Sequence, residues 1–178
     1  PVRGLFSIPF VGLSSNGIPM YNINGKITST DIDFQTRDNI DYLKYEGPTD
    51  PTITGSFGNI FTYKAFKLNV FITYSFGNVV RLNPCFNYQY SDLSSMPREF
   101  KNRWTVPGDE KHTNIPAIIS KRQYEDNKDL MYAYNAYNYS TERIAKGDFI
   151  RMKEISLSYD FPKSWITSAK ISNLSLKL

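Results

Sequence analysis

The stretch that decides the fold is KLNVFITYSF, residues 67–76, in which apolar and polar residues alternate along the chain. A period of two is the signature of a β-strand with one apolar and one polar face. Five residues share the apolar face: Leu68, Val70, Ile72, Tyr74 and Phe76. The opposite face carries Lys67, Asn69, Thr73 and Ser75, with Phe71 as its only large apolar residue. The pattern predicts one strand and leaves open whether a protein core or lipid covers the apolar face.

The same alternation recurs in four other stretches, from VRGLFSIPF near the start to AKISNLSLKL at the end. In the fourth stretch, Ile155, Leu157, Tyr159 and Phe161 share one face. The pattern predicts strands over about residues 2–10, 54–64, 67–76, 148–161 and 170–178. These lengths are close to the roughly 9–11 residues that a tilted strand needs to cross a bilayer.

The connections between these strands alternate between long and short. Residues 11–53 and 77–147 form long connections, whereas 65–67 and 162–168 are short. Outer-membrane barrels have short periplasmic turns and long extracellular loops, while a compact soluble domain favours connections of about 2–6 residues. The sequence therefore predicts an all-β fold of antiparallel up-and-down strands from a transmembrane barrel, with long extracellular loops.

Composition excludes several classes of function. The net charge of +4 is spread in mixed runs with no basic block, so no nucleic-acid partner is expected. A single cysteine, Cys85, and a single histidine, His112, leave no disulfide framework and no thiolate or histidine metal site. The loop carboxylates near Glu125 lack the setting of a catalytic pair, and no nucleophile stands in a recognised motif. We therefore expect no enzyme activity, no bound metal and no cofactor.

Three longer segments resemble a known family. They are LKYEGPTDPTITGSFGNIFTYKAFKLNVFITYSFGNVVRLNP (43–84), RWTVPGDEKHTNIP (103–116) and YNYSTERIAKGDFIRMKEISLSYDFP (137–162). They are similar to the C-terminal barrel region of SusC/RagA-type TonB-dependent outer-membrane receptors of Bacteroidetes. The resemblance extends from about Gly4 to Leu178. Its most specific markers are the GPTDP-to-GSFGN approach to a strand, the Arg103-Trp104 loop, and the strand GDFIRMKEISLSYDFP with its terminal proline.

The resemblance implies a barrel of about 22 strands whose lumen is closed by an N-terminal plug. It also implies import of large nutrients, such as glycans or peptides, energised through the TonB complex. A SusD-like surface lipoprotein would form a lid over the extracellular loops. The plug, the segment that contacts TonB and any signal peptide are then expected upstream of Pro1, outside this chain. Residues 1–178 would be a fragment of the barrel domain, because five strands cannot close a barrel and lipid does not tolerate open sheet edges.

The resemblance also answers which solvent lies on the apolar face. We expect outer-membrane lipid to cover Leu68, Val70, Ile72, Tyr74 and Phe76. The residues Asn69, Thr73 and Ser75 would face a polar lumen. Tyr74 and Phe76 lie at the outer end of the strand, where an aromatic girdle marks the membrane interface.

The connection 77–147 holds the candidate contacts for a ligand or a protein partner. Its segment YAYNAYNY, 132–139, is expected to be extended, with a bulge or turn near Asn135, and a helix is possible over 92–102. Tyr and Asn suit a sugar or peptide ligand, and Tyr, Trp and Arg suit a protein interface. Packing of the loop against itself stays an alternative. The candidates are Arg98, Arg103, Trp104, Lys121, Arg122, Tyr124, Tyr132, Tyr134, Tyr137 and Tyr139.

A second function stays open on the residues alone. The aromatic and Asn content of the chain would also suit a secreted, soluble carbohydrate-binding β-sandwich. The two hypotheses differ in what covers the apolar strand faces: a second sheet in a sandwich, and lipid in a barrel.

Overall fold

The computed structural model describes residues 3–30, 32, 40–86, 95–167 and 170–178. The chain divides into two compact units. The first, here called the mixed unit, comprises Pro1–Thr49 and Val79–Lys146. The second, here called the sheet unit, comprises Asp50–Asn78 and Gly147–Leu178.

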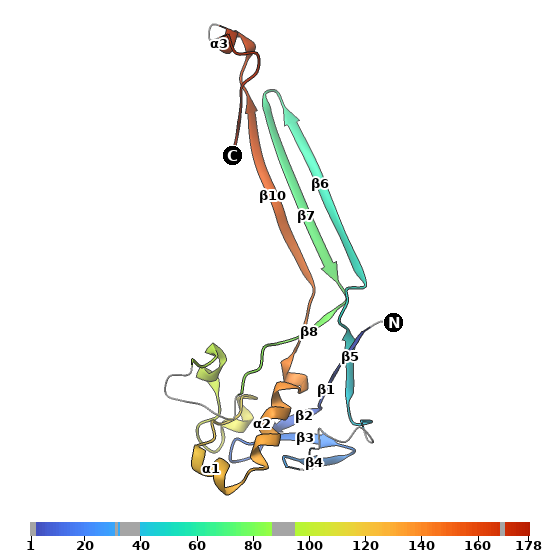
Figure 1. Cartoon of the computed structure of the whole chain (residues 1–178), viewed down its shortest axis with the longest axis vertical. Helices are drawn as coiled ribbons and strands as arrows, with labels where there is room; N and C mark the ends of the chain where they lie inside the picture. Colours follow the sequence, from blue (N-terminus) through green and yellow to red (C-terminus); the bar gives the residue numbers. More distant parts are fainter. Residues whose placement is uncertain (1–2, 31, 33–39, 87–94, 168–169) are drawn as a thin grey trace. The chain divides into compact units, whose positions relative to one another are not determined.

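The sheet unit is built from four antiparallel strands in the order β11-β10-β7-β6 (Figure 1). They are β6 (Ile53–Tyr63), β7 (Phe66–Phe76), β10 (Phe149–Asp160) and β11 (Ser175–Lys177). Three of them lie where alternation predicts strands over 54–64, 67–76 and 148–161. The strand predicted over 170–178 is shortened to β11, and the connection 162–168 contains a short helix, α3 (Lys163–Ile166). Within the described residues these strands form an open sheet.

A two-residue turn joins β6 to β7. Tyr63 lies opposite Phe66, so Lys64 and Ala65 alone form the loop, one position earlier than predicted. Lys64 has a φ of 53°, in the left-handed region that short hairpin loops require. This turn fixes the register of the whole hairpin, since every later pair follows from it.

The two faces of this sheet differ sharply in polarity. Ile72 lies between Phe57 and Met152, whereas Thr73 lies between Ser56 and Arg151. Large apolar side chains continue across the first face and are mostly exposed: Ile53, Phe57, Phe61, Tyr63, Phe66, Ile150, Met152, Ile155, Leu157 and Leu176. Hence one face of the sheet is mostly apolar and uncovered within the sheet unit, with Asn59 of β6 as a polar residue in it. The opposite face is mostly polar but also carries Ile60, Phe71 and Phe149.

A β-bulge keeps β10 in phase with this surface. Met152 pairs with Ile72 and Glu154 with Phe71, so Lys153 is the extra residue. Strict alternation would place Met152 and Ile155 on opposite faces. The extra residue returns Ile155, Leu157 and Tyr159 to the face that holds Met152.

Two glycines of β6 make room for aromatic rings of β7. A Cβ at Gly55 would lie 2.3 Å from the Tyr74 hydroxyl, and one at Gly58 would lie 2.8 Å from the Phe71 ring. The second contact explains how Phe71 lies on the polar face. Its ring covers the bare backbone at Gly58 instead of breaking the pattern of the strand.

The mixed unit combines small antiparallel sheets with short helices. Its sheets pair β1 (Gly4–Ser7) with β5 (Lys44–Pro48), β2 (Phe10–Leu13) with β3 (Pro19–Ile23) and β4 (Lys26–Thr28), and β8 (Val79–Arg81) with β9 (Ile144–Lys146). Its helices are η1 (Arg98–Asn102), η2 (Asp109–Lys111), α1 (Lys121–Asp126), α2 (Leu130–Asn138) and η3 (Thr141–Arg143). The described parts of the connections 11–53 and 77–147 are thus largely folded.

The single strand predicted over 2–10 is wrong. Its described part divides into β1 and the start of β2, which belong to different sheets. Ile8, between them, bridges to Ser140 instead, and Pro9 has no N–H to donate to a ladder. Phe6 is exposed while Ile8 is buried, so the two do not share a face, and Val2 lies outside the described residues.

The extended conformation predicted for 132–139 is also wrong, because this segment is helix α2. Leu130, Ala133, Tyr134 and Tyr137 are spaced i, i+3, i+4, i+7 and are all buried. The helix allowed over 92–102 is a 3₁₀ turn, η1, preceded by Pro97 as N-cap; residues 92–94 lie outside the described residues. None of the helices in the described ranges is long and apolar enough to span a membrane.

Candidate functional site

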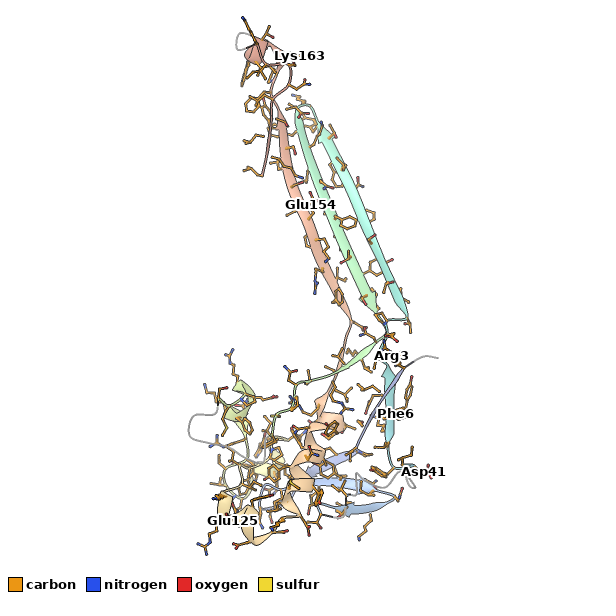
Figure 2. The ribbon with its side chains drawn as sticks, viewed as in Figure 1. Arg3, Phe6, Asp41, Glu125, Glu154 and Lys163 are labelled. Atoms are coloured by element: carbon orange, nitrogen blue, oxygen red, sulfur yellow. The ribbon has the colours of Figure 1, made fainter. Side chains whose placement is uncertain are left out.

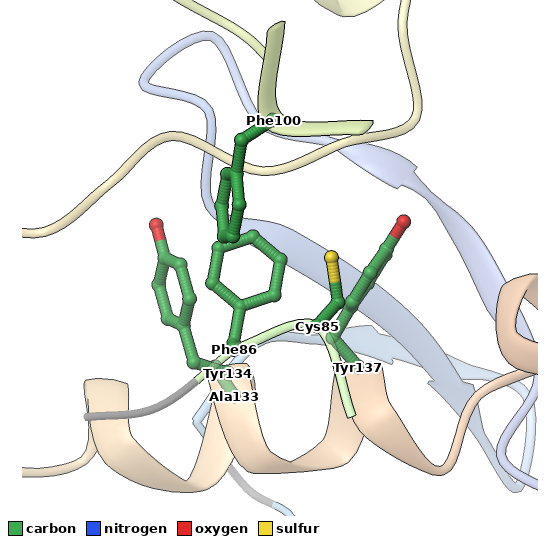
Figure 3. Packing of buried hydrophobic residues seen from close by; sticks show 6 residues of the cluster. All are labelled: Cys85, Phe86, Phe100, Ala133, Tyr134 and Tyr137. Atoms are coloured by element: carbon green, nitrogen blue, oxygen red, sulfur yellow. The ribbon is translucent and has the colours of Figure 1, made fainter. Parts of the chain in front are cut away.

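The aromatic core of the mixed unit is centred on Phe86 (Figure 3). Its ring makes edge-to-face contacts with Phe100, Tyr134 and Tyr137, at centroid distances of 4.8, 5.1 and 5.3 Å. Such pairs contribute beyond the burial of their area. Tyr134 and Tyr137, expected as candidate ligand contacts, are 3% and 2% exposed. Both are core residues of the mixed unit, and Tyr134 also lines a cavity beside Trp104.

A second buried cluster holds helix α2 against the β2-β3-β4 sheet. Tyr21, fully buried on β3, donates its hydroxyl to the Ala133 carbonyl at 2.7 Å. Ile8, Ile32 and Ala136 complete the cluster. Burial raises the pKa of Tyr21 well above its ordinary value, so this hydroxyl stays a donor. Helix α2 is therefore fixed by both clusters.

Asn138, the last residue of α2, binds the backbone of the segment that follows β8. Its Oδ1 accepts hydrogen bonds from the Cys85 and Phe86 N–H groups at 2.8 and 3.0 Å. Its Nδ2 donates to the Phe86 carbonyl at 2.9 Å. One side chain thus satisfies three buried backbone groups that lie outside any ladder.

Arg143 is a buried charge that joins three segments. Its Nη1 lies 2.8 Å from Glu99 Oε2, and its Nη2 donates to the Asn83 carbonyl at 2.6 Å. The hydrogen bond from Arg143 lowers the pKa of Glu99. Burial raises the pKa of the neighbouring Cys85 thiol to about 12, so this cysteine is protonated and unreactive at neutral pH.

Trp104 lies between two shallow cavities. Its Nε1 donates to Glu110 Oε2 at 3.1 Å, and its N–H donates to the Ile115 carbonyl at 2.9 Å. A Cβ at Gly17, whose φ is +73°, would come within 2.5 Å of the indole. The larger cavity, about 290 Å³, is lined by Asn16, Ile18, Trp104, Ala117, Ile118, Ile119, Gln123, Leu130 and Tyr134. The smaller, about 270 Å³, is lined by Arg103, Trp104, Thr105, Ala117 and Ile118.

The other candidates lie at the surface of the mixed unit. Tyr132 and Tyr139 are 36% and 48% exposed, and Tyr139 is covered on one side by Arg81, at 5.1 Å from the ring centroid. Tyr124 is half-buried and its hydroxyl lies 3.7 Å from Met131 Sδ. The remaining candidates are exposed or half-buried: Arg98, Arg103, Lys121 and Arg122. The structure therefore separates the expected set into core residues and surface residues.

The polar face of the sheet unit carries paired charges. Lys67 Nζ lies 2.7 Å from Asp160 Oδ2. Glu154 accepts from Lys177 Nζ at 3.1 Å and from Ser156 Oγ at 3.0 Å, and it lies midway along β10 (Figure 2). Paired charges and hydroxyls are the chemistry of a wet surface. Among the described residues, no cluster of three or more His, Cys, Asp or Glu could hold a metal ion.

The chain matches solved structures of a peptide importer in fold. It aligns with a chain of the RagAB peptide transporter with a TM-score of 0.65 and 18% identity, covering 98% of this chain and 18% of that one. It aligns with the 'open-open' state of the RagAB peptide importer with a TM-score of 0.62 and 18% identity, covering 97% and 17%. No family model and no curated protein matches the sequence.

This likeness shows the fold, at an identity too low to show more. Nearly the whole chain is aligned, including the mixed unit and the sheet unit. The chain spans less than a fifth of the length of the structures that it matches, with 19% for the 'closed-closed' state of the same importer. The chain therefore shares the fold of the aligned part of these structures, which in this chain is mostly antiparallel sheet with few helices.

Proposed function

We propose that this chain is part of the C-terminal barrel of an outer-membrane, TonB-dependent nutrient importer that takes up peptides or glycans. The observation that carries the proposal is the two-faced sheet of the sheet unit. Its apolar face extends over β6, β7 and β10, with Asn59 as a polar residue on β6, and is largely exposed, while its polar face holds ion pairs. Large exposed apolar surfaces mark sites covered by another phase or molecule. Transport, not catalysis, is the role that this arrangement supports.

The dimensions of β7 support lipid as that phase. Its 11 residues make ten steps, and ten steps of about 3.3 Å give about 33 Å. At a strand tilt of about 40°, this corresponds to roughly 25 Å along the membrane normal, the height of the apolar band in such barrels. The strand is long enough to cross the hydrocarbon layer once.

A soluble carbohydrate-binding sandwich is less well supported. A sandwich requires a second sheet packed about 10 Å from the first. The described residues of the sheet unit contain one sheet, and its apolar side chains are left exposed, with Ile150 at 69% and Ile155 at 65%.

The mixed unit supplies a folded loop surface for a partner. In the proposal this surface is extracellular and contacts a SusD-like surface lipoprotein, while TonB would act through segments outside this chain. Tyr132 and Tyr139 present aromatic rings, and the Lys121 and Arg122 side chains are 88% and 92% exposed. Aromatic residues and Arg are enriched at the anchors of protein interfaces.

Cysteine scanning along β7 tests the barrel. Each position from 68 to 75 is replaced by Cys in the full-length protein in its native membrane. We expect water-soluble maleimide to label positions 69, 73 and 75, and nitroxide lipids to quench a probe only at 68, 70, 72 and 74. Native Cys85, buried and protonated, should add no background. Labelling without a period of two would reject the proposal.

Co-purification tests the partner surface separately. Tyr132→Ala combined with Arg122→Glu should lower recovery of the surface lipoprotein, because the pair removes an aromatic anchor and reverses a charge. Both side chains are exposed, so the fold of the mixed unit should not change. Lys101→Glu, on the exposed side of η1, is the matched control and should leave recovery unchanged. Equal recovery with all variants would remove this surface from the proposal and leave the barrel assignment standing.

A further inference from the structure

The turn end of the sheet unit carries a row of aromatic rings in contact. Phe66 and Tyr159 lie 4.8 Å apart, Tyr159 and Phe161 5.1 Å, and Phe161 and Trp165 6.5 Å, between ring centroids. The row begins on β7, continues from the end of β10 and reaches α3. It follows directly from the apolar face, because Phe66 and Tyr159 are paired with each other on that face.

Helix α3 buries Ile166 and leaves the side chain of Trp165 exposed. Ile166 is 5% exposed, whereas Trp165 is 67% exposed. The turn is fixed by bonds from the Trp165 N–H to the Pro162 carbonyl at 3.0 Å and from Thr167 Oγ1 to the Lys163 carbonyl at 2.6 Å. The exposed indole is thus a consequence of an ordered turn, and its neighbour Ile166 takes the buried position.

Lysines lie next to this row in the chain, in α3 and in the β6–β7 turn. Lys163 begins α3 and lies at the tip of the sheet unit (Figure 2). Lys64 lies in the β6–β7 turn, with its Nζ 5.3 Å from the Tyr63 ring centroid. Residues 161–178 include three lysines and no acidic residue. Lys177 is paired with Glu154, whereas Lys163 and Lys170 have no carboxylate partner among the described residues, and the nearest acid in the sequence, Asp160, is paired with Lys67. The aromatic row therefore adjoins a surface with an excess of lysine.

We propose that this end of the sheet unit binds the phospholipid headgroup layer, with the aromatic rings at the interface and Lys64, Lys163 and Lys170 against lipid phosphates. The inference rests on the proposed function, since it requires the apolar face to lie in a membrane. Trp and Tyr favour the headgroup level because their rings are amphipathic. Lysine near a membrane surface attracts anionic lipid, and Lys163 and Trp165 lie two residues apart in the same short helix.

Probe depth tests the position of α3. A fluorophore is attached to Cys at position 164, next to Trp165, in the full-length protein in lipid nanodiscs. We expect stronger quenching by headgroup nitroxides than by nitroxides deep in the acyl chains. Position 72 should show the reverse order, and position 69 should show little quenching by either. If no lipid nitroxide quenches the probe at 164 and the probe at 72 is quenched as expected, the inference is overturned and the barrel assignment stands. Loss of quenching at 72 would instead reject the barrel itself.

Lipid selectivity tests the lysines. Lys163→Gln with Lys170→Gln should lower the preference of the 164 probe for nitroxide-labelled anionic lipid over zwitterionic lipid, by about five-fold for each lysine at low salt. Trp165→Phe should leave this preference unchanged, and Lys101→Gln, in the mixed unit, is the control. An unchanged preference in the double variant, or equal loss in the control, would overturn the role of the lysines.

Discussion

At the residue scale, position and not residue type decides which aromatic residues are available to a partner. Tyr132 and Tyr134 are two residues apart, yet Tyr132 is 36% exposed and Tyr134 is 3% exposed. On a helix, residues two apart point in different directions. The same spacing on a strand would have put both rings on one face, which is the arrangement that the sequence predicts.

Alanine substitutions should separate the two kinds of tyrosine. Tyr137→Ala removes a buried ring and should cost about 3–5 kcal/mol, whereas Tyr132→Ala should cost well under half as much. The readout is the urea concentration at which Cys85, buried beside Tyr137, becomes reactive to a thiol reagent in the full-length protein. Similar midpoints for the two variants would contradict the placement of Tyr137 in the core.

The pair of Glu99 and Arg143 makes an acid-sensitive contact. The hydrogen bond from Arg143 lowers the pKa of Glu99 below its ordinary value of 4.5. A depressed carboxyl pKa stabilises the fold above the ordinary pKa, and this stabilisation is lost as pH falls through the folded-state value. We expect the urea concentration at which Cys85 becomes reactive to decrease when the pH is lowered below about 4.5. The thiol reagent must be one that reacts in acid, such as 4,4′-dithiodipyridine. Glu99→Gln should lower the midpoint at pH 7 and weaken its acid dependence. Equal acid loss in both proteins would assign the effect to other carboxyls, such as Asp109 and Glu110.

Charge placed on the two faces of β7 should have opposite consequences. In the proposed barrel, Ile72→Arg should cost about 2–4 kcal/mol if the residue lies at the bilayer midplane, and Thr73→Arg much less, because the second would face the lumen. The measurement is the yield of folded receptor in the outer membrane, with urea unfolding in liposomes for the free energy. Comparable damage at both positions would indicate a protein core on both sides of the sheet.

At the element scale, the bulge at Lys153 decides whether β10 can serve as a membrane strand. Residues before and after it lie on the apolar face only because one residue is left out of the pairing. A register change of one residue moves every later side chain to the other face. The bulge is thus a condition for the two-faced sheet.

Removing one residue from β10 should therefore have an effect that depends on its position. Deleting Lys153 removes the unpaired residue, so Met152, Glu154 and Ile155 would alternate regularly and keep their partners on β7. Deleting Ser156, in the regularly paired part, would turn Leu157 and Tyr159 to the polar face. We expect the variant without Lys153 to reach the outer membrane and the variant without Ser156 to be absent from it, as measured by membrane fractionation with immunoblotting. Normal assembly of the variant without Ser156 would show that β10 is not held in this register.

At the scale of the whole molecule, the sequence could predict the segments whose apolar residues repeat with only one period. β6 and β7 lie close to their predicted bounds because alternation over 11 residues has one structural solution, and β10 does so because its second half, from Ile155 onward, alternates regularly. Segment 132–139 fits both a strand and the helical spacing of Leu130, Ala133, Tyr134 and Tyr137. The choice depends on Phe86, Phe100 and Tyr21, which lie far away in the sequence and pack around α2. A single sequence does not reveal such contacts.

The candidate surface was predictable only in part for the same reason. Residue types suggested Tyr, Trp and Arg between 98 and 139, and the structure keeps Arg122 and Tyr132 at the surface while taking Tyr134 and Tyr137 into the core. The aromatic row at the turn end went unpredicted, because Trp165 lies in a segment expected to be a plain turn. Its signal was a Trp among lysines directly after an amphipathic strand.

Topology is the property on which the whole assignment depends. The proposal places helix α1 outside the cell and the Lys64-Ala65 turn in the periplasm, because the long connections of such barrels are extracellular. Helix α1 is exposed and ordered, with a capping box from Ser120 and Gln123 at its start. On intact cells, a membrane-impermeant amine reagent or trypsin should therefore react near Lys121 and Arg122, unless a bound lipoprotein covers them. A short epitope inserted between Lys64 and Ala65 should be detected only after the outer membrane is permeabilised. Detection of that epitope on intact cells would invert the topology, and it would place the aromatic row around Trp165 in the outer leaflet instead of the inner one.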